Sequence, residues 1–560
     1  METRTSTEPR PRRAFHGFVA GVASRRSRLL SLVVGLSCAA RALDVYPSPG
    51  GDTLASPFFS AAVGPQALPA FVYFTARGLM QPVAPGNNVP QPSDRNTSFF
   101  GFAFDPATDG RVTVVVTLTD AGAAPPSTAQ IFPLRAAALL PAPTIAGRAI
   151  TLTLDQPRQV CLVVDGRTDA PLCVFADPPE TFVPSPSDPS VIFFKPGTVD
   201  AGVITVAEGQ TVYLAGGAHV YGRIEMAAGS SGACSAAGAS VAVRGRGVLD
   251  GHRFTIDVNG PSLISLQCLN ALVEGVTLID SPQYNLAAYW PYTTVRWVKA
   301  IAWGFSTDGF TGGSQSVIES SFIKVNDDSL KLFATGTLAT DIVLWQMENG
   351  CVVMGSWNLN TNQAFITARR IDVIRHERAA RYYDPDALLC FMHGGSAALA
   401  NYLFDDIRVD MPGYAAVQIF VAHNSFAHPT GALGSVLNVI VRNFSSTTSF
   451  LAPQPVQLQG YAAASNVAGV VLDSVAFGGR AASQANVAVS GDPGFVGPVA
   501  ICAGCSQAVV GADWTEAQKC SMPDSYCRSS GAAALRPAPL AAAAGAVAAV
   551  AAAAAAAAEP

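Results

Sequence analysis

The sequence predicts an all-β protein in which an antiparallel β-sandwich precedes a right-handed parallel β-helix. Charged residues make up only 13% of the 560 residues, whereas Gly, Pro and β-branched residues are frequent, and this mixture favours strands and turns. Apolar runs recur along the second half with few helical patterns between them. Because the chain is too long for one ordinary core, it needs two domains or a solenoid.

The first element, residues 1–42, is predicted to be a targeting segment. A basic cluster at 25–28 precedes the apolar run 29–36, and Ala40-Arg41-Ala42 forms a small-x-small cleavage motif. The run is short for a bilayer span, so a cleaved signal peptide is expected, with an uncleaved signal anchor as the alternative. A cleaved signal predicts a secreted protein, whereas an anchor would hold it at the membrane, and the protein is expected to be a monomer.

The charge balance excludes one class of partner. Without residues 1–42, which hold eight arginines and two glutamates, 35 basic and 40 acidic residues become 27 and 38, a net charge of −11. A nucleic-acid-binding protein would carry a basic footprint instead. A polyanionic polymer would also prefer a basic cleft, so a neutral polymer fits better.

Residues 43–195 are predicted to form the β-sandwich. Short apolar runs such as 111–119 and 149–154 are separated by frequent turn signals. Cys161 and Cys173 flank a hairpin-like stretch with an Asp-Gly turn signal at 165–166. In an oxidising compartment these two cysteines are expected to pair.

Residues 196–500 are predicted to form the β-helix. Apolar β-rich runs, among them 212–214, 276–279 and 342–345, recur at intervals of roughly 20 to 35 residues. Such a loose repeat indicates stacked coils that bury their apolar faces on each other. A βαβ architecture would need helical patterns between the strands, while a large β-sandwich remains an alternative.

The C-terminal part divides into a Cys-rich segment, 501–530, and an Ala-rich tail, 531–560. The first is expected to hold disulfides, with a zinc site as the alternative, at Cys502, Cys505, Cys520 and Cys527. The tail is either a glycolipid-anchor signal, which would place the protein at the cell surface, or a low-complexity end. Asn96-Thr97-Ser98 and Asn443-Phe444-Ser445 are candidate glycosylation motifs.

The densest polar group in the predicted β-helix contains Asp308, Asp327 and Asp328. Asp308 and Asp327 are 19 residues apart, about one short coil, so they could lie on adjacent rungs about 4.8 Å apart. Crowded carboxylates raise the pKa of one member, and a protonated carboxyl beside ionised ones can cleave a glycosidic bond. Because consecutive strand residues face opposite sides, Asp327 and Asp328 need a strand end or a bulge. A turn and a calcium site are the alternatives.

The same segment resembles glycoside hydrolase family 49, the dextranase and isopullulanase family. The resemblance covers roughly residues 190–440 and is carried by 212–218, 245–251, 307–309, 326–332, Trp345, 349–350 and 354–357. It implies inverting hydrolysis of α-glucans, with Asp327 as the general acid and Asp308 and Asp328 holding the attacking water. Ser356 and Phe310 depart from the family pattern near the expected subsites.

Three further residues are assigned to substrate binding: Asn326, Lys331 and Trp357. For Lys331 the alternatives are setting the local pKa values or pairing with a neighbouring carboxylate. Trp357 is either a platform for the apolar face of a sugar or a buried core residue.

We therefore expect an endo-acting hydrolase of a dextran- or pullulan-like polysaccharide that needs no metal or cofactor. One alternative is a polygalacturonase-like pectin hydrolase, whose Gly-His-Gly signature is missing after Asp328, since His393-Gly394-Gly395 lies too far on. A second is a cell-surface β-helix that binds glycan without cutting it.

Overall fold

The computed structural model describes residues 43–87, 95–120, 122–227, 234, 240–378, 385–425, 431–491 and 494–504. The predicted targeting segment, the Ala-rich tail and Cys505, Cys520 and Cys527 lie outside these ranges. Within them, no helix is long and apolar enough to cross a membrane.

The N-terminal part is the predicted β-sandwich, and alternating burial explains its strands. In one strand Val112, Val114 and Val116 are buried while the residues between them are more exposed. One sheet has the order β1 (Asp44–Val45), β5 (Asn96–Ala103), β11 (Leu172–Asp177), β10 (Arg158–Val164) and β7 (Ala129–Phe132), with β4 (Tyr73–Ala76) also on β5. The other has the order β3 (Leu68–Ala70), β2 (Phe59–Val63), β6 (Val112–Leu118), β9 (Ala149–Leu154) and β8 (Thr144–Ala146).

All sandwich pairings are antiparallel except that of β11 with β5. The predicted pair Cys161–Cys173 is a disulfide across the β10–β11 hairpin. Four short helical turns complete the described chain: α1 (Pro106–Asp109), α2 (Leu134–Ala137) and the 3₁₀ turns η1 (Arg77–Leu79) and η2 (Gln484–Asn486).

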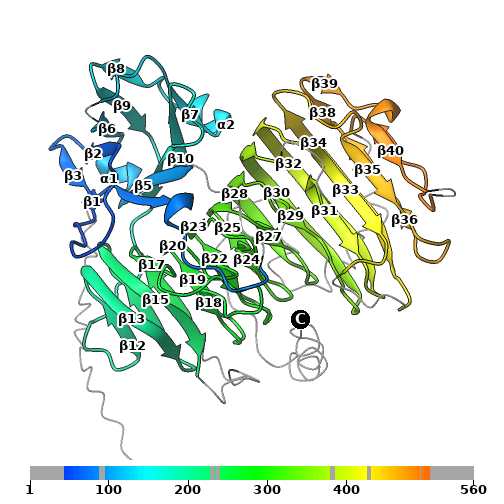
Figure 1. Cartoon of the computed structure of the whole chain (residues 1–560), viewed down its shortest axis with the longest axis horizontal. Coiled ribbons are helices and arrows are strands. Elements are labelled where there is room, and N and C mark those ends of the chain that lie inside the picture. Colours follow the sequence, from blue (N-terminus) through cyan, green and yellow to red (C-terminus); the bar gives the residue numbers. More distant parts are fainter. Residues whose placement is uncertain are drawn as a thin grey trace, which may run out of the picture. The chain divides into compact units, whose positions relative to one another are not determined.

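The remaining strands, β12 to β41, form one continuous sheet in which strands of successive rungs pair in parallel, apart from the antiparallel β38–β39 pair (Figure 1). This is the predicted parallel β-helix, and its topology excludes a second large sandwich. It begins at β12, slightly before the predicted boundary.

The rungs stack in three columns. The first column contains β12 (Val191–Phe194), β14 (Thr211–Leu214), β16 (Ala242–Gly245), β19 (Leu272–Glu274), β22 (Thr294–Arg296) and β25 (Val317–Glu319). The second contains β13 (Gly197–Val206), β15 (Ala218–Met226), β17 (Val248–Asp250), β20 (Thr277–Ile279), β23 (Lys299–Ile301) and β26 (Phe322–Val325).

Longer strands then run through both of these columns, and shorter ones end them: β28 (Leu338–Gln346), β30 (Gln363–His376), β32 (Ala398–Met411), β34 (Ser435–Ser446), β36 (Val467–Ala468), β37 (Val471–Asp473), β38 (Ala476–Phe477), β39 (Arg480–Ala481) and β41 (Ala500–Cys502).

The third column carries the candidate site. Its strands are β18 (Ile264–Ser265), β21 (Leu286–Ala287), β24 (Phe310–Thr311), β27 (Leu330–Lys331), β29 (Val353–Met354), β31 (Ala387–His393), β33 (Ala415–Val421), β35 (Val456–Gln459) and β40 (Val487–Val489). Leu286, Phe310, Leu330 and Val353 are direct partners on four successive rungs, and all are fully buried in the core. This apolar stack fixes the register of the polar residues that precede each strand.

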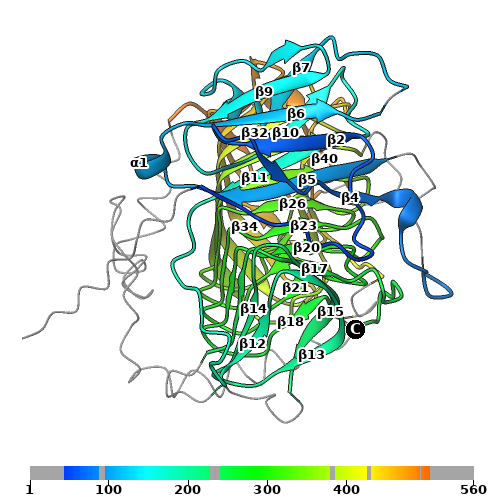
Figure 2. The ribbon, with the colours of Figure 1, turned by 90° about the vertical axis from the view of Figure 1, so that its left-hand side faces the viewer.

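The sandwich packs against the second column. Figure 2 shows β17, β20, β23 and β26 in succession beside the sandwich strands β4, β5 and β11. Phe175 of β11 contacts Phe322 of β26 with ring centroids 5.1 Å apart. Lys299 crosses the same interface to Asp177, with Nζ 2.5 Å from the carboxylate, and both side chains are buried. The interface therefore contains both apolar packing and a buried ion pair.

Candidate active site

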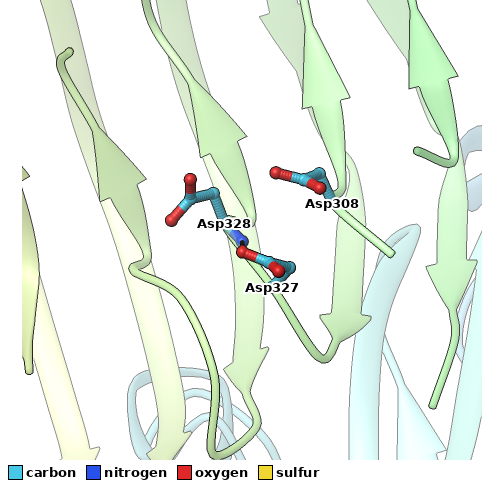
Figure 3. Close-up of side chains that lie close together, drawn as sticks. All are labelled: Asp308, Asp327 and Asp328. Carbon is cyan, nitrogen blue, oxygen red and sulfur yellow. Dashed lines mark hydrogen bonds between the residues drawn. The ribbon is translucent and has the colours of Figure 1, made fainter. Parts of the chain in front are cut away.

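Asp308 and Asp328 occupy the same position on adjacent rungs. Asp308 lies two residues before Phe310 of β24, and Asp328 lies two residues before Leu330 of β27, and Phe310 pairs directly with Leu330. Asp327 precedes Asp328 in the bend that joins β26 to β27. Because a bend breaks the alternation of a strand, the consecutive acids can approach the same neighbour. Figure 3 shows the three carboxylates together, and one oxygen of each lies within 4.8 Å of the others.

Asp328 is fully buried but has hydrogen-bond donors on both oxygens. The backbone N–H of Cys351 donates to Oδ1 at 3.0 Å, and the indole N–H of Trp357 donates to Oδ2 at 3.0 Å. Burial and the charge of Asp327 raise the pKa of Asp328 to about 6, although Lys331 and the two hydrogen bonds oppose this rise. Such a carboxyl changes its protonation state near neutral pH.

Asp308 is paired with the one cation of the cluster. Lys331 Nζ lies 2.5 Å from Asp308 Oδ1 and 3.9 Å from Asp328 Oδ2, and it donates to the hydroxyl of Tyr284 at 2.7 Å. Burial raises the pKa of Asp308 well above its usual value, Lys331 opposes the rise, and Asp327 and Asp328 add to it. One cation thus faces three acids.

Asp327 differs from its two neighbours because it is partly exposed. Its Oδ2 accepts hydrogen bonds from the backbone N–H of Ser306 at 2.9 Å and from Asn349 Nδ2 at 2.7 Å. Its Oδ1 accepts the backbone N–H of Asp328 at 2.9 Å. Three donors fix the orientation of the most exposed carboxyl of the three.

The bend is held by a buried amide network. Gln346 Nε2 donates to the carbonyl of Asp327 at 2.8 Å and to that of Asn349 at 2.5 Å. Gly350 has φ +73°, and a Cβ there would lie 2.3 Å from the backbone of Asp327 and Asp328. Only glycine permits this approach, so the turn at 349–350 packs tightly on the acidic bend.

Asn326 is not placed as predicted. Its side chain is fully buried, its Nδ2 donates to the carbonyl of Trp303 at 2.8 Å, and its Oδ1 accepts the N–H of Asn349 at 3.1 Å. With both ends of the amide bonded to backbone, Asn326 holds the bend. Its role in substrate binding stays a prediction that these contacts do not support.

Lys331 and Trp357 both contact the acids. Lys331 pairs with Asp308, which matches the predicted alternative in which the lysine pairs with a neighbouring carboxylate. Trp357 is partly buried against an apolar cluster that includes Met354, and its indole N–H faces Asp328. A sugar platform therefore stays a prediction for the exposed part of its ring.

Two functional neighbours were missed at the level of sequence. Asn349 was noticed only as part of a motif, and its contact with Asp327 depends on the path of the turn. Tyr284 has a positional signal, because it lies two residues before Leu286, as Asp308 lies before Phe310. The register of the rungs, once known, would have singled it out.

In the described residues, these three carboxylates form the only group of three or more His, Cys, Asp or Glu side chains that could hold a metal ion. Hard cations such as calcium prefer carboxylate oxygens, so the donor type fits. Lys331 already places a positive charge against two of the three acids, and this charge would oppose a bound cation.

Fold and site together define a parallel β-helix protein with a cluster of carboxylates contributed by adjacent rungs. No family model matches the chain. It is 25% identical over 197 residues to a dextranase of Arthrobacter sp. (strain CB-8) and to a dextranase of Arthrobacter globiformis. The match covers 30% of this chain, and the chain spans only 30% of the length of these relatives.

Among solved structures, Dex49A from Penicillium minioluteum superimposes with a TM-score of 0.58 at 14% identity, covering 82% of this chain and 96% of that one. The dextranase relatives confirm the predicted resemblance to the dextranase family, and the superposition confirms the fold class.

Proposed function

We propose that the protein is a glycoside hydrolase that cleaves α-glucosidic bonds of a dextran- or pullulan-like polysaccharide. The observation that carries this proposal is the meeting of Asp308, Asp327 and Asp328, from two adjacent rungs, with different exposures and with raised pKa values of Asp308 and Asp328. Acids held in different protonation states are what glycosidic cleavage requires. The names of the matched relatives support an α-glucan such as dextran as the substrate.

In the proposed mechanism Asp327 protonates the leaving oxygen, because it is the most exposed of the three carboxyls. Asp308 and Asp328 hold and activate the attacking water. A base works best when its pKa lies near the operating pH, and the pKa of Asp328 is about 6. Lys331 keeps the buried acids able to ionise, and Asn349 orients Asp327.

Inversion of the anomeric carbon is proposed from the resemblance to family 49. Carboxyl groups of inverting enzymes are commonly about 6.5–9.5 Å apart and those of retaining enzymes about 5–5.5 Å. Here one oxygen of each acid lies within 4.8 Å of the others, which is closer than the usual spacing in inverting enzymes. The attacking water would therefore have to be held by two of the acids together, on one side of the sugar. Proton NMR during the first minutes of digestion tests this: β-anomeric product is expected, and initial α-anomer would refute inversion.

Secretion is proposed as well. Three disulfides occur in the described residues, Cys161–Cys173, Cys234–Cys268 and Cys351–Cys390, and such bonds persist in oxidising compartments. Asn443 is exposed, whereas Asn96 is buried in β5, so only the second of the two motifs could carry a glycan in the folded protein.

The activity is tested by incubating the wild-type protein and an Asp327→Asn variant with dextran, pullulan and polygalacturonate. The wild type is expected to release reducing sugar from an α-glucan, and the variant to lose at least about a hundredfold of this rate, as expected for loss of a general acid. Asp341→Asn, on an exposed ion pair with Arg370, is the control that should keep full activity.

Equal release by the wild type and the Asp327→Asn variant would refute the assignment of the acid. Release from polygalacturonate alone would favour a pectin hydrolase. No release from any polymer would favour a β-helix that only binds glycan.

A further inference from the structure

The sandwich reaches the acidic bend through two arginines. Arg77 follows β4, Arg95 precedes β5, and the backbone N–H of Arg77 donates to the carbonyl of Arg95 at 3.0 Å. Arg77 Nη2 lies 2.6 Å from Glu348 Oε2, and Arg95 Nη1 lies 3.2 Å from the same oxygen. The Arg77 side chain is only 4% exposed. Two neighbouring sandwich strands therefore converge on one glutamate of the β-helix.

Glu348 belongs to the turn that orients Asp327. The next residue, Asn349, donates through Nδ2 to Asp327 Oδ2 at 2.7 Å and through its backbone N–H to Asn326 Oδ1 at 3.1 Å. Gly350 then packs on the backbone of Asp327. Three consecutive residues thus link the sandwich arginines to the proposed acid.

A second sandwich contact lies on the rung of Asp308. Thr75 of β4 accepts a hydrogen bond from the indole N–H of Trp303 at 2.9 Å, and the carbonyl of Trp303 accepts Asn326 Nδ2 at 2.8 Å. Trp303 flanks the acidic bend on one side and Glu348 flanks it on the other. Trp303 contacts Thr75 of β4, and Glu348 contacts Arg77 in the turn that follows β4.

We propose that the sandwich is a positioning element of the active site, in which Arg77 sets the orientation of Asp327 through Glu348 and Asn349. This inference rests on the proposed function, because it concerns the placement of the proposed acid. Arg77 touches neither substrate nor the reacting atoms, so it is a positioning residue.

The first test compares Arg77→Gln with Arg246→Gln. Arg246 is equally buried, at 3%, and also crosses from the β-helix to the sandwich, where it lies 3.6 Å from Asp177. Arg77→Gln is expected to lower kcat on dextran by about tenfold or more with KM nearly unchanged, since small misplacements of a catalytic group cost up to about a hundredfold. Arg246→Gln is expected to lower the melting temperature without this loss of kcat.

The second test is a double-mutant cycle. If Arg77 acts through Asn349, the loss of kcat in the Arg77→Gln/Asn349→Ala variant should equal that of Asn349→Ala alone. Glu348→Gln, which removes the negative charge of a partly exposed side chain, repeats the cycle if Arg77→Gln does not fold. Losses that multiply, or an equal loss of kcat in Arg246→Gln, would overturn the proposal.

A third measurement does not depend on activity. Hydrogen exchange of the peptide 345–352 should accelerate in Arg77→Gln or Glu348→Gln but not in Arg246→Gln, because Asn349 and Cys351 donate their backbone N–H groups within the site. If the wild type cleaves no polymer, the proposed function fails while this exchange still tests the link. Unchanged exchange in the first two variants would refute the link itself.

Discussion

Replacing Lys331 with methionine removes the cation of the acidic cluster while keeping most of the volume of the side chain. Lys331 Nζ lies 2.5 Å from Asp308 and 3.9 Å from Asp328, and the lysine is only 7% exposed. Removing one partner of a buried ion pair typically costs about 3–5 kcal/mol, because the other charge stays buried without a partner. We expect the free energy of unfolding of Lys331→Met at pH 7 to fall by this amount.

The direction in which the kcat/KM profile of Lys331→Met shifts with pH follows from the pKa values of Asp308 and Asp328. Lys331 lowers the pKa of both Asp308 and Asp328, so its loss raises both values further. A higher pKa means that the proposed bases ionise only at higher pH, and the acid limb of the kcat/KM profile moves in that direction. For a shift of about one pH unit, activity falls about tenfold at pH 5 and little at pH 8. The stability loss should be smaller at pH 5 than at pH 7, because acids with raised pKa values hold more protons at the lower pH and need less of a counter-ion.

The measurements are kcat/KM on dextran from pH 4 to 8 and denaturant unfolding at pH 5 and 7. Lys299→Met is the matched control, because Lys299 Nζ lies 2.5 Å from the buried Asp177 at the sandwich interface, on the second column and not on the third column that carries the acids. It should lose stability without a shift of the acid limb. The reasoning is refuted if Lys331→Met leaves the limb in place, or if Lys299→Met moves it equally.

Three further outcomes are expected. Trp357→Phe removes the N–H that donates to Asp328, a hydrogen bond to a charged group worth about 1.5–3 kcal/mol, so kcat/KM should fall about tenfold to a hundredfold. The acid limb should move to higher pH, because this bond lowers the pKa of Asp328; an unmoved limb would contradict the role. Gly350→Ala should abolish activity and destabilise far more than Gly479→Ala, which has the same φ of +73° but nothing within 4 Å of its Cβ and should cost only about 1–2 kcal/mol. Equal melting temperatures would show that contact with Asp327 does not matter. Finally, the carboxyl of Asp328 has an ordinary pKa of 3.8 and a folded value of about 6, so its ionisation opposes folding. This group should lower wild-type stability by about 2 kcal/mol between pH 4 and 6.5, and Asp328→Asn should lack this fall in denaturant titrations.

The β-helix could be predicted from the sequence because its determinants are local and repeated. Apolar residues return at each rung, and Phe310 and Leu330 stack as partners because both must face the core. The same repeat made it reasonable to expect acids on adjacent rungs to lie side by side, but the residue at the position of Asp308 on the next rung is Asp328 and not Asp327. The bend before β27 then lets Asp327 join them.

The contacts around the acids could not be predicted in this way. Whether Asn326 faces solvent or backbone depends on the path of the turn at 349–350, which belongs to the next rung. The approach of Arg77 joins residues 271 positions apart through the docking of a separate domain, and no periodicity in the chain encodes it. Periodic patterns specify register, whereas the burial of a polar side chain depends on every element packed around it.

The alternatives to catalysis, a turn and a cation site, make different demands on the same residues. A turn explains the bond from the N–H of Asp328 to Asp327 and that from Cys351 to Asp328, but it has no need of a third acid buried on the preceding rung. A cation site would need the carboxylate oxygens to face a bound ion. Here the ammonium group of Lys331 lies against Asp308 and already supplies the positive charge that such an ion would bring. Buried acids with raised pKa values reduce stability, and a single lysine compensates only part of that cost. The proposed hydrolysis makes use of this imbalance, because the raised pKa values of Asp308 and Asp328 keep a proton among the carboxyls near neutral pH. The balance of charges therefore favours hydrolysis over either structural role.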